Sequence, residues 1–133
     1  MLKKKLVGNQ QKTALITSNW IYLLKGKEFT RQIKIDGVRA LTRSVPQGKP
    51  KNVVEESEFI IHIKNDYDIR YHMEKKERRD DLFVRIKAIY FSKFNRNLPC
   101  FDVLPADISK YELKKDQARP KQDLIPPDQN RNR

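Results

Sequence analysis

Apolar and polar residues alternate in two runs between residues 57 and 73, with a short polar stretch between them. The apolar positions of the two runs are Phe59, Ile61, Ile63, Tyr67, Ile69, Tyr71 and Met73. A period of two is typical of β-strands that bury one face. The pattern predicts a β-hairpin with these residues on its inner face, and with His62 and His72 on its outer face.

The register of this hairpin follows from the length of its loop. A two-residue loop would place Asp68 opposite Ile63 and bury a charge. A three-residue loop, residues 64–66, pairs Ile61 with Ile69 and keeps both apolar sets on one face. This stretch contains asparagine and aspartate, which tolerate the left-handed conformation that such a loop requires. We therefore expect the three-residue loop.

From about residue 76 the period changes to that of an amphipathic helix. The apolar positions are Leu82, Phe83, Ile86, Ile89, Tyr90 and Phe94. The basic residues assigned to the wetter side are Arg78, Arg79, Arg85, Lys87 and Lys93. Spacings of three and four predict a helix over residues 76–94 whose apolar side covers the sheet.

Five further runs of β-forming residues precede the hairpin, at residues 1–7, 12–17, 20–25, 29–35 and 38–44. In the fourth run we expect Phe29, Ile33 and Ile35 to share one face. Turn-forming residues at 18–19 and 36–37 separate neighbouring runs. Seven strands followed by one helix predict an α+β, mainly β fold: a bent antiparallel sheet or barrel closed by a C-terminal amphipathic helix.

The length suits one domain with extensions. We expect the domain to span residues 1–104, with a short extended piece at its end. Residues 105–116 are expected to form a docked extension, and residues 117–133 a polar, flexible tail. The tail is rich in proline, glutamine and asparagine, so it cannot bury enough apolar area to offset the entropy of ordering.

Charge is spread unevenly along the chain. The whole chain has 29 Lys and Arg against 17 Asp and Glu, a net charge of +12. Residues 1–54 contribute 12 − 2 = +10, and residues 55–133 contribute 17 − 15 = +2. A basic N-terminal part indicates an acidic partner, which could be lipid headgroups, nucleic acid or an acidic protein surface such as a filament.

Several function classes are disfavoured by what the sequence lacks. The single cysteine, Cys100, excludes an intramolecular disulfide and fits a reducing compartment. No apolar run approaches the ~20 residues of a spanning helix, and the N-terminus lacks a secretory signal. We expect a cytoplasmic protein that is peripheral to a membrane or associated with the cytoskeleton.

Catalytic and metal chemistry are also not expected. We find no glycine-rich phosphate loop, no pairing of a nucleophile with a base and no zinc-ligand spacing, so we predict neither enzyme activity, nor a metal, nor a cofactor. Trp20 is expected in the core or on a sheet surface. A role in stacking on nucleic-acid bases would require companion aromatic residues exposed beside it.

Three segments together resemble the class I myosin tail homology domain, a membrane-binding module with a pleckstrin-homology (PH)-like fold. The first is KTALITSNWIYLL at residues 12–24, and the second is RQIKIDGVRALTRS at residues 31–44. The third, residues 56–90, resembles the family's acidic-aromatic strand, the strand after it and the closing helix. The resemblance covers roughly residues 3–104 and implies a PH-like, seven-stranded fold without a motor.

The resemblance also implies a binding site for anionic phospholipids, phosphoinositides in particular. The residues that it points to are Lys3, Lys4, Lys5, Lys12, Lys25, Lys27 and Arg31. In the family, two basic residues one position apart precede the second strand. Here Lys12 follows Gln10 and Gln11, so only one of the two is present.

Two function hypotheses remain open at this point. In the first, the chain binds phosphoinositide membranes through its basic N-terminal part and links them to the cytoskeleton. In the second, it is a cytoskeletal or ciliary accessory protein that binds an acidic filament, such as actin or tubulin, or a protein complex. Nucleic acid is disfavoured as a partner because no recognised motif accompanies the charge.

Overall fold

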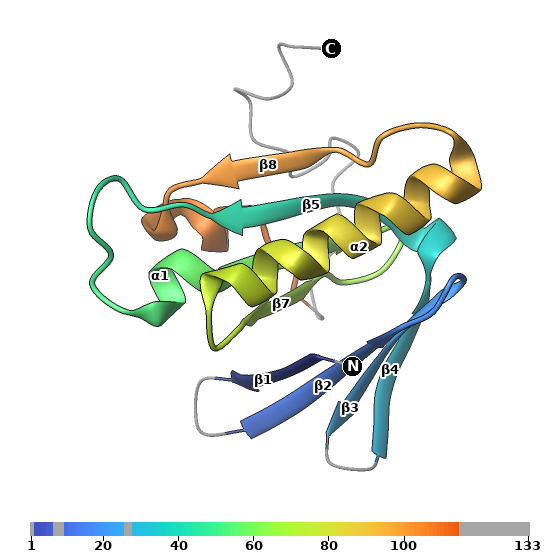
Figure 1. Cartoon of the computed structure of the whole chain (residues 1–133), viewed down its shortest axis with the longest axis horizontal. Helices are drawn as coiled ribbons and strands as arrows, with labels where there is room; N and C mark the ends of the chain where they lie inside the picture. The colour runs from blue at the N-terminus through green and yellow to red at the C-terminus, as the bar shows by residue number, and fades with distance from the viewer. Residues whose placement is uncertain (1, 7–9, 26–27, 115–133) are drawn as a thin grey trace.

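The computed structural model describes the backbone of residues 2–6, 10–25 and 28–114, and the side chains of residues 14–24 and 28–114. Within these ranges the fold is α+β and mainly sheet (Figure 1). It contains two four-stranded sheets, two α-helices and two short 3-10 helices. The predicted tail, residues 117–133, lies outside these ranges.

The first sheet is an antiparallel meander. It consists of β1 (Leu2–Leu6), β2 (Gln10–Ile16), β3 (Trp20–Lys25) and β4 (Glu28–Lys34), in that spatial order. The predicted turn between β2 and β3 is present, and the Thr17 hydroxyl accepts a hydrogen bond from the Trp20 N–H at 3.0 Å. The inner face of the sheet buries Ala14, Ile21 and Ile33.

The second sheet combines the predicted hairpin with strands from farther along the chain. It consists of β5 (Val38–Ser44), β6 (Glu58–Ile63), β7 (Ile69–His72) and β8 (Cys100–Val103), in the order β7-β6-β5-β8. The 3-10 helix η1 (Ile35–Gly37) turns the chain from β4 into β5. β8, expected only as an extended piece, pairs in parallel with β5.

This topology corrects the predicted sheet in two respects. All seven predicted strands are present, but they divide between two separate sheets instead of forming one. The eighth strand also makes the second sheet mixed, not purely antiparallel. The chain reverses at η1, and this turn is where the two sheets part.

The long helix has the predicted limits. α2 (Lys76–Phe94) ends at Asn95, which adopts the left-handed conformation with φ 54°. α2 lies across β5 and β7 in Figure 1. The Phe83 ring meets the Phe59 ring of β6 edge-on, with 5.7 Å between centroids. A shorter helix, α1 (Val53–Ser57), precedes β6, and the Asn52 side chain caps it.

The predicted hairpin register is confirmed by the pairing of Ile61 with Ile69. Asn65 takes the left-handed conformation in the turn, with φ 60°. The paired ladder ends at Ile61 and Ile69, so the connection is longer than the predicted three-residue loop, and the Asp68 carboxylate accepts the backbone N–H of Ile63 at 3.1 Å. Asp68 is therefore buried at the base of the turn and does not face solvent.

Strand β6 is buried on both faces, which corrects the expectation of a wet outer face. His62 was assigned to that outer face, yet it is completely buried, and so is Ile60 on the same side of the strand. The 3-10 helix η2 (Pro105–Tyr111) contacts β5, and Ile108 and Leu113 of this C-terminal segment are buried too. The Asp68 N–H donates to the Leu113 carbonyl at 2.9 Å, which ties this segment to the hairpin.

A register shift in the first sheet changes the face of one aromatic residue. Ile33 is buried as predicted, but Phe29, expected on the same face, is 65% exposed. The pairing of β3 with β4 shifts between Leu23 and Leu24, and the Thr30 hydroxyl donates to the Leu23 carbonyl there. A β-bulge of this kind reverses the alternation, so Phe29 lies on the outer face.

The packing of α2 predicts a strong asymmetry between two neighbouring positions. Ile86→Asp should lower the free energy of unfolding by several kcal/mol, because an unpaired carboxylate would enter a core in which Ile86 is 0% exposed. Val84→Asp is the matched control, since Val84 is 64% exposed on the same helix. It should change that free energy by at most about 0.5 kcal/mol. Denaturant unfolding followed by circular dichroism compares the two, and equal effects would contradict the packing.

Candidate functional site

Lysines from three neighbouring strands meet in one row near one end of the first sheet. The register places Lys4 opposite Lys12, and Lys12 opposite Lys25. The connections from β1 to β2 and from β3 to β4 lie at this same end, which we call the loop end. Directly opposed residues on neighbouring strands share one face of a sheet. We call these three positions the basic row; their side chains lie outside the described ranges.

The other predicted site residues are distributed more widely. Lys3 and Lys5 flank Lys4 along β1, so strand alternation assigns them to the opposite face. Lys27 lies outside the residues that the structure describes. Arg31 is the one predicted site residue whose side chain is described, and its surroundings differ from those of an open binding surface.

Arg31 extends from β4 to the turn between β6 and β7. Its side chain is 11% exposed, and its Nη2 lies 3.6 Å from the Asp66 carboxylate. The guanidinium carbon is 3.7 Å from the centroid of the Tyr67 ring, and Nη2 also donates to the Tyr67 carbonyl. These contacts join the two sheets, so the charge of Arg31 is already engaged within the molecule.

A cleft of about 430 Å³ opens beside this contact, between β4, β7 and the C-terminal segment. Arg70 on its wall lies 2.5 Å from the Glu58 carboxylate and 3.2 Å from that of Glu112. Burial alone would lower the pKa of Arg70, but the two carboxylates raise it above its ordinary value. Two acids therefore offset the one cation, and Arg70 does not make this cleft an anion site.

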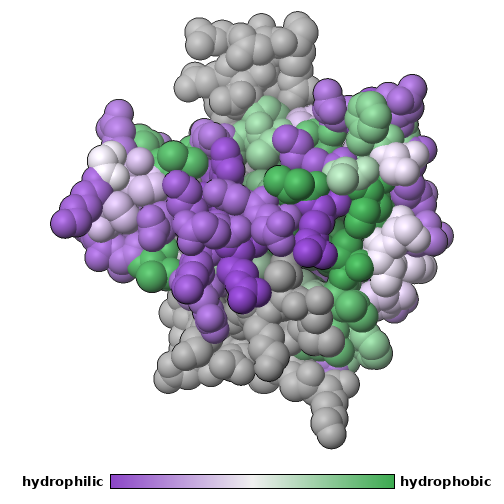
Figure 2. Space-filling view, viewed as in Figure 1, coloured by the Kyte–Doolittle hydropathy of each residue, from purple (hydrophilic) through white to green (hydrophobic). Residues whose placement is uncertain are grey.

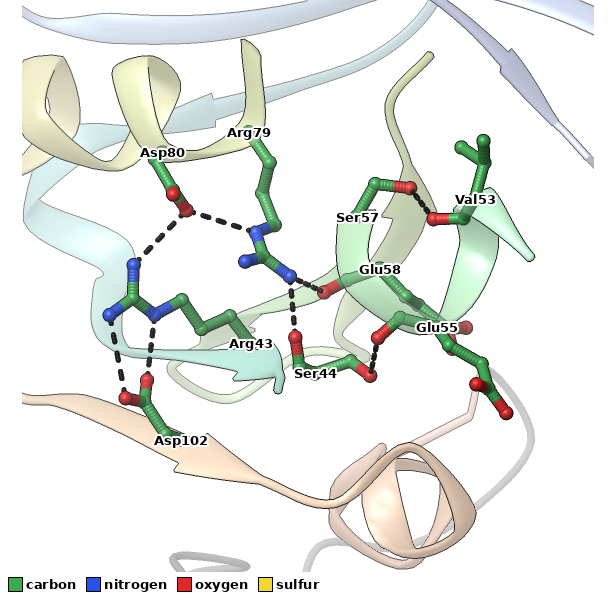
Figure 3. Close-up of polar contacts among 9 residues, drawn as sticks. All are labelled: Arg43, Ser44, Val53, Glu55, Ser57, Glu58, Arg79, Asp80 and Asp102. Atoms are coloured by element: carbon green, nitrogen blue, oxygen red, sulfur yellow. Dashed lines mark hydrogen bonds and ion pairs between the residues drawn. The ribbon is translucent and has the colours of Figure 1, made fainter. Parts of the chain in front are cut away.

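A second charged cluster lies where α2 begins, over β5 and β8 (Figure 3). Arg43 Nε is 2.7 Å from an oxygen of Asp102, and its Nη1 is 3.0 Å from Asp80 Oδ1. Asp80 also accepts a hydrogen bond from Arg79 Nε at 3.1 Å. The hydrogen bond with Asp102 is the main reason that the pKa of Arg43 is raised. A cavity of about 470 Å³ borders the cluster. Both arginines of the cluster are already paired with Asp80 or Asp102 of the same chain.

Arg79 within this cluster corrects its predicted place on the wetter side of α2. It is 1% exposed, and its Nη1 donates to the carbonyls of Ser44, at 2.6 Å, and Glu58, at 3.2 Å. Burial lowers the pKa of Arg79. Because both acceptors belong to strands of the second sheet, Arg79 anchors the first turns of α2 to that sheet.

The two histidines also differ from their predicted setting. His62 Nδ1 lies 3.0 Å from an oxygen of Asp68, and its Nε2 lies 2.7 Å from the Thr42 hydroxyl. Hydrolytic enzymes use an acid, a histidine and a hydroxyl in this order. Here all three side chains are buried, so the hydroxyl cannot meet a substrate. The arrangement is a structural chain of hydrogen bonds between strands. His72 is half-buried at the end of β7.

Asp68 carries the charge of this chain. Burial alone would raise the pKa of its carboxyl group. The hydrogen bond and charge of His62, with the N–H groups of Leu113 and Ile63, outweigh burial, so the pKa of Asp68 lies below its ordinary value. The carboxylate is therefore ionised and stabilises the folded state at neutral pH.

An aromatic cluster occupies the outer face of the first sheet. The ring centroids of Trp20 and Tyr22 are 6.1 Å apart, and those of Tyr22 and Phe29 are 5.5 Å apart. Lys34 Nζ lies 5.6 Å from the Trp20 ring centroid. The alternation of Trp20 and Tyr22 is visible in the sequence, but Phe29 joins them only through the bulge. In Figure 2, hydrophilic residues dominate the surface over α2, whereas hydrophobic residues reach the surface beside β4.

Metal-ligating side chains and the single cysteine are the remaining candidates for a chemical site. Within the described ranges, no group of three His, Cys, Asp or Glu residues is placed to hold a metal ion. Cys100 is half-buried, and burial raises the pKa of its thiol. A thiol rather than a thiolate at neutral pH makes Cys100 a weak nucleophile.

Comparison with known proteins gives no family assignment. No family model matches this chain, and no curated protein sequence matches it significantly. The resemblance to class I myosin tail homology domains therefore stands on the three segments alone. Among the helices that the structure describes, none is long and apolar enough to cross a membrane.

The setting of Asp68 predicts an acid-sensitive fold. Asp68→Asn should lower the free energy of unfolding at neutral pH by about 2–4 kcal/mol, because the amide presents a donor where Leu113 N–H or His62 needs an acceptor. A carboxyl group whose pKa is lowered by folding stabilises the protein at pH values above its unfolded pKa of about 3.9. That stabilisation is lost as the pH falls through the pKa of the folded state. The parent should therefore lose more stability than Asp68→Asn when pH is lowered below about 4.

The control for this experiment is the neighbouring carboxylate Asp66. It is 57% exposed and lies 3.6 Å from Arg31, so Asp66→Asn should cost at most about 1 kcal/mol. Urea unfolding at several pH values measures both variants. The same acid dependence in Asp68→Asn as in the parent would show that Asp68 is not the group responsible.

Proposed function

We propose that this chain is a non-catalytic, PH-like module that binds anionic phospholipid membranes, especially those with phosphoinositides, through the loop end of its first sheet. The order of elements supports a PH-like arrangement. An antiparallel sheet of β1–β4 precedes the antiparallel strands β5–β7, and α2 follows them and packs on the shared core. β8 and η2 are additions after the helix.

The basic row is the observation that carries the proposal. Like charges directly opposite each other destabilise a sheet, and the row contains two such pairs, Lys4 with Lys12 and Lys12 with Lys25. Among the register partners, Glu28 lies opposite Lys25 and offsets part of the charge of this row. Strands lie about 4.8 Å apart, so a multiply charged headgroup could contact more than one lysine. A bound anion would relieve the repulsion between these lysines.

The number of cations is sufficient for reversible attachment. Each lysine near an anionic leaflet contributes about 1 kcal/mol. The basic row supplies three lysines at the loop end, on the same face of the sheet as Ala14 and Leu23, and the register assigns Lys3 and Lys5 of β1 to the opposite face. Arg31, Arg43 and Arg70 differ from these lysines, because each of them contacts a carboxylate of the same chain.

Charge reversal in the basic row tests the proposal. Lys12→Glu with Lys25→Glu changes the charge by −4, which at about 1 kcal/mol per charge weakens membrane binding by about 4 kcal/mol, on the order of a thousandfold. The matched control is Arg78→Glu with Lys87→Glu, two exposed positions of α2 with the same charge change. Co-sedimentation with phosphatidylcholine vesicles that contain phosphoinositide measures binding, and circular dichroism confirms that each variant is folded.

The outcomes separate three possibilities. Loss of binding in the basic-row variant alone, with steep weakening by salt, supports the proposed site. Equal losses in both variants would mean diffuse attraction without a site. If the parent ignores vesicles and instead co-sediments with microtubules or actin filaments, the membrane proposal is wrong and a filament is the partner.

A further inference from the structure

The outer face of the first sheet exposes aromatic and aliphatic side chains next to the loop end. Phe29 is 65% exposed, and its strand partner Leu24 is half-buried. Tyr22 and Trp20 continue the row of rings toward the other end of the sheet. No element of the described structure packs over Phe29, so this apolar surface lacks a partner within the described chain.

The charged residues that the strand register assigns to this face are lysines. Lys34 lies over Trp20, and the register assigns Lys3 and Lys5 to this same face of the sheet. Of the described residues on this face of β2, β3 and β4, none is acidic. The natural complement is an apolar surface bordered by negative charge.

We infer that this aromatic face is the part of the module that enters the headgroup region of an anionic bilayer. Tyrosine and tryptophan favour the membrane–water interface because an apolar ring adjoins a polar group. Phe29, the most exposed of the three rings, would reach deepest, while the lysines meet lipid phosphates. This inference rests on the proposed function and adds to it the surface that contacts the acyl region.

Two other occupants fit less well. A second copy of the chain would bring Lys34 and the β1 lysines against their own kind, and the chain has a net charge of +12. Bases of single-stranded nucleic acid stack on open ring faces. Here Trp20 stacks on Tyr22 with 26° between the ring planes, and Lys34 lies over the same Trp20 ring. Leu24, the strand partner of Phe29, has no ring on which a base could stack.

The chain contains its own probe for this inference, because Trp20 is its only tryptophan. Vesicles of phosphatidylcholine with phosphatidylserine or phosphoinositide should shift Trp20 fluorescence to shorter wavelength. Lipids with brominated acyl chains should quench it. Phe29→Ser should weaken vesicle binding about tenfold, as expected for the loss of one buried aromatic side chain.

The matched control is Phe91→Ser, because Phe91 is 48% exposed on α2 and does not belong to the aromatic face. It should bind vesicles as the parent does. Because Phe29 is exposed, its replacement should leave the thermal unfolding midpoint nearly unchanged. A Trp20 shift together with a loss specific to Phe29→Ser supports the inference.

The remaining outcomes each overturn it in a distinguishable way. Vesicle binding without a Trp20 response, and with Phe29→Ser equal to the parent, would reject the aromatic face and leave the proposed function intact. No vesicle binding by the parent would reject both. Quenching of Trp20 by a single-stranded oligonucleotide, without any response to vesicles, would assign the face to nucleic acid.

Discussion

The buried carboxylate of Asp68 joins the β6–β7 hairpin to the C-terminal segment, whose Leu113 lies 45 positions farther along the chain. It accepts hydrogen bonds from His62 on β6, from Ile63 at the start of the turn and from Leu113 in the C-terminal segment. A buried charge is tolerated only when its partners are in place. The β6–β7 hairpin and the segment after β8 therefore depend on each other. Because that segment closes the far side of the second sheet, β6 is buried on both faces.

This closure distinguishes the surroundings of the two sheets. The second sheet is covered by α2 on one face and by the C-terminal segment on the other, and its Arg43 and Arg70 are paired with acids of the same chain. The first sheet has one covered face and one outer face with exposed rings. Arg31, stacked on Tyr67, links the first sheet to the hairpin of the second. We propose that a partner binds the loop end and outer face of the first sheet.

Local periodicity was sufficient to predict the hairpin register and the limits of α2. Features that depend on distant contacts were not predictable in this way. β8 has only four residues and finds its partner, β5, more than fifty positions earlier. His62 is buried by the C-terminal segment, which no pattern within the hairpin indicates. Arg79 precedes Leu82 and Phe83 by three and four positions, so helical geometry places it on their side despite its charge.

The candidate site was predictable in part for the same reasons. The sequence identified the lysines of the first strands, and the strand register then aligned three of them in a row. It could not show that Arg31 turns toward Tyr67, nor that a bulge carries Phe29 to the outer face. The direction of Arg31 depends on the hairpin turn that contains Tyr67, and the face of Phe29 depends on how β4 pairs with β3. The sequence of β4 alone determines neither.

The central claim is that the first sheet, and not α2, meets the anionic surface. Hydrogen–deuterium exchange of the whole chain with and without phosphoinositide vesicles tests it most directly. The account predicts that added protection is concentrated in residues 2–6, 10–25 and 28–34, with α2 and η2 unchanged. Protection concentrated on α2 or η2, or none at all in the first sheet while vesicles are bound, would contradict it.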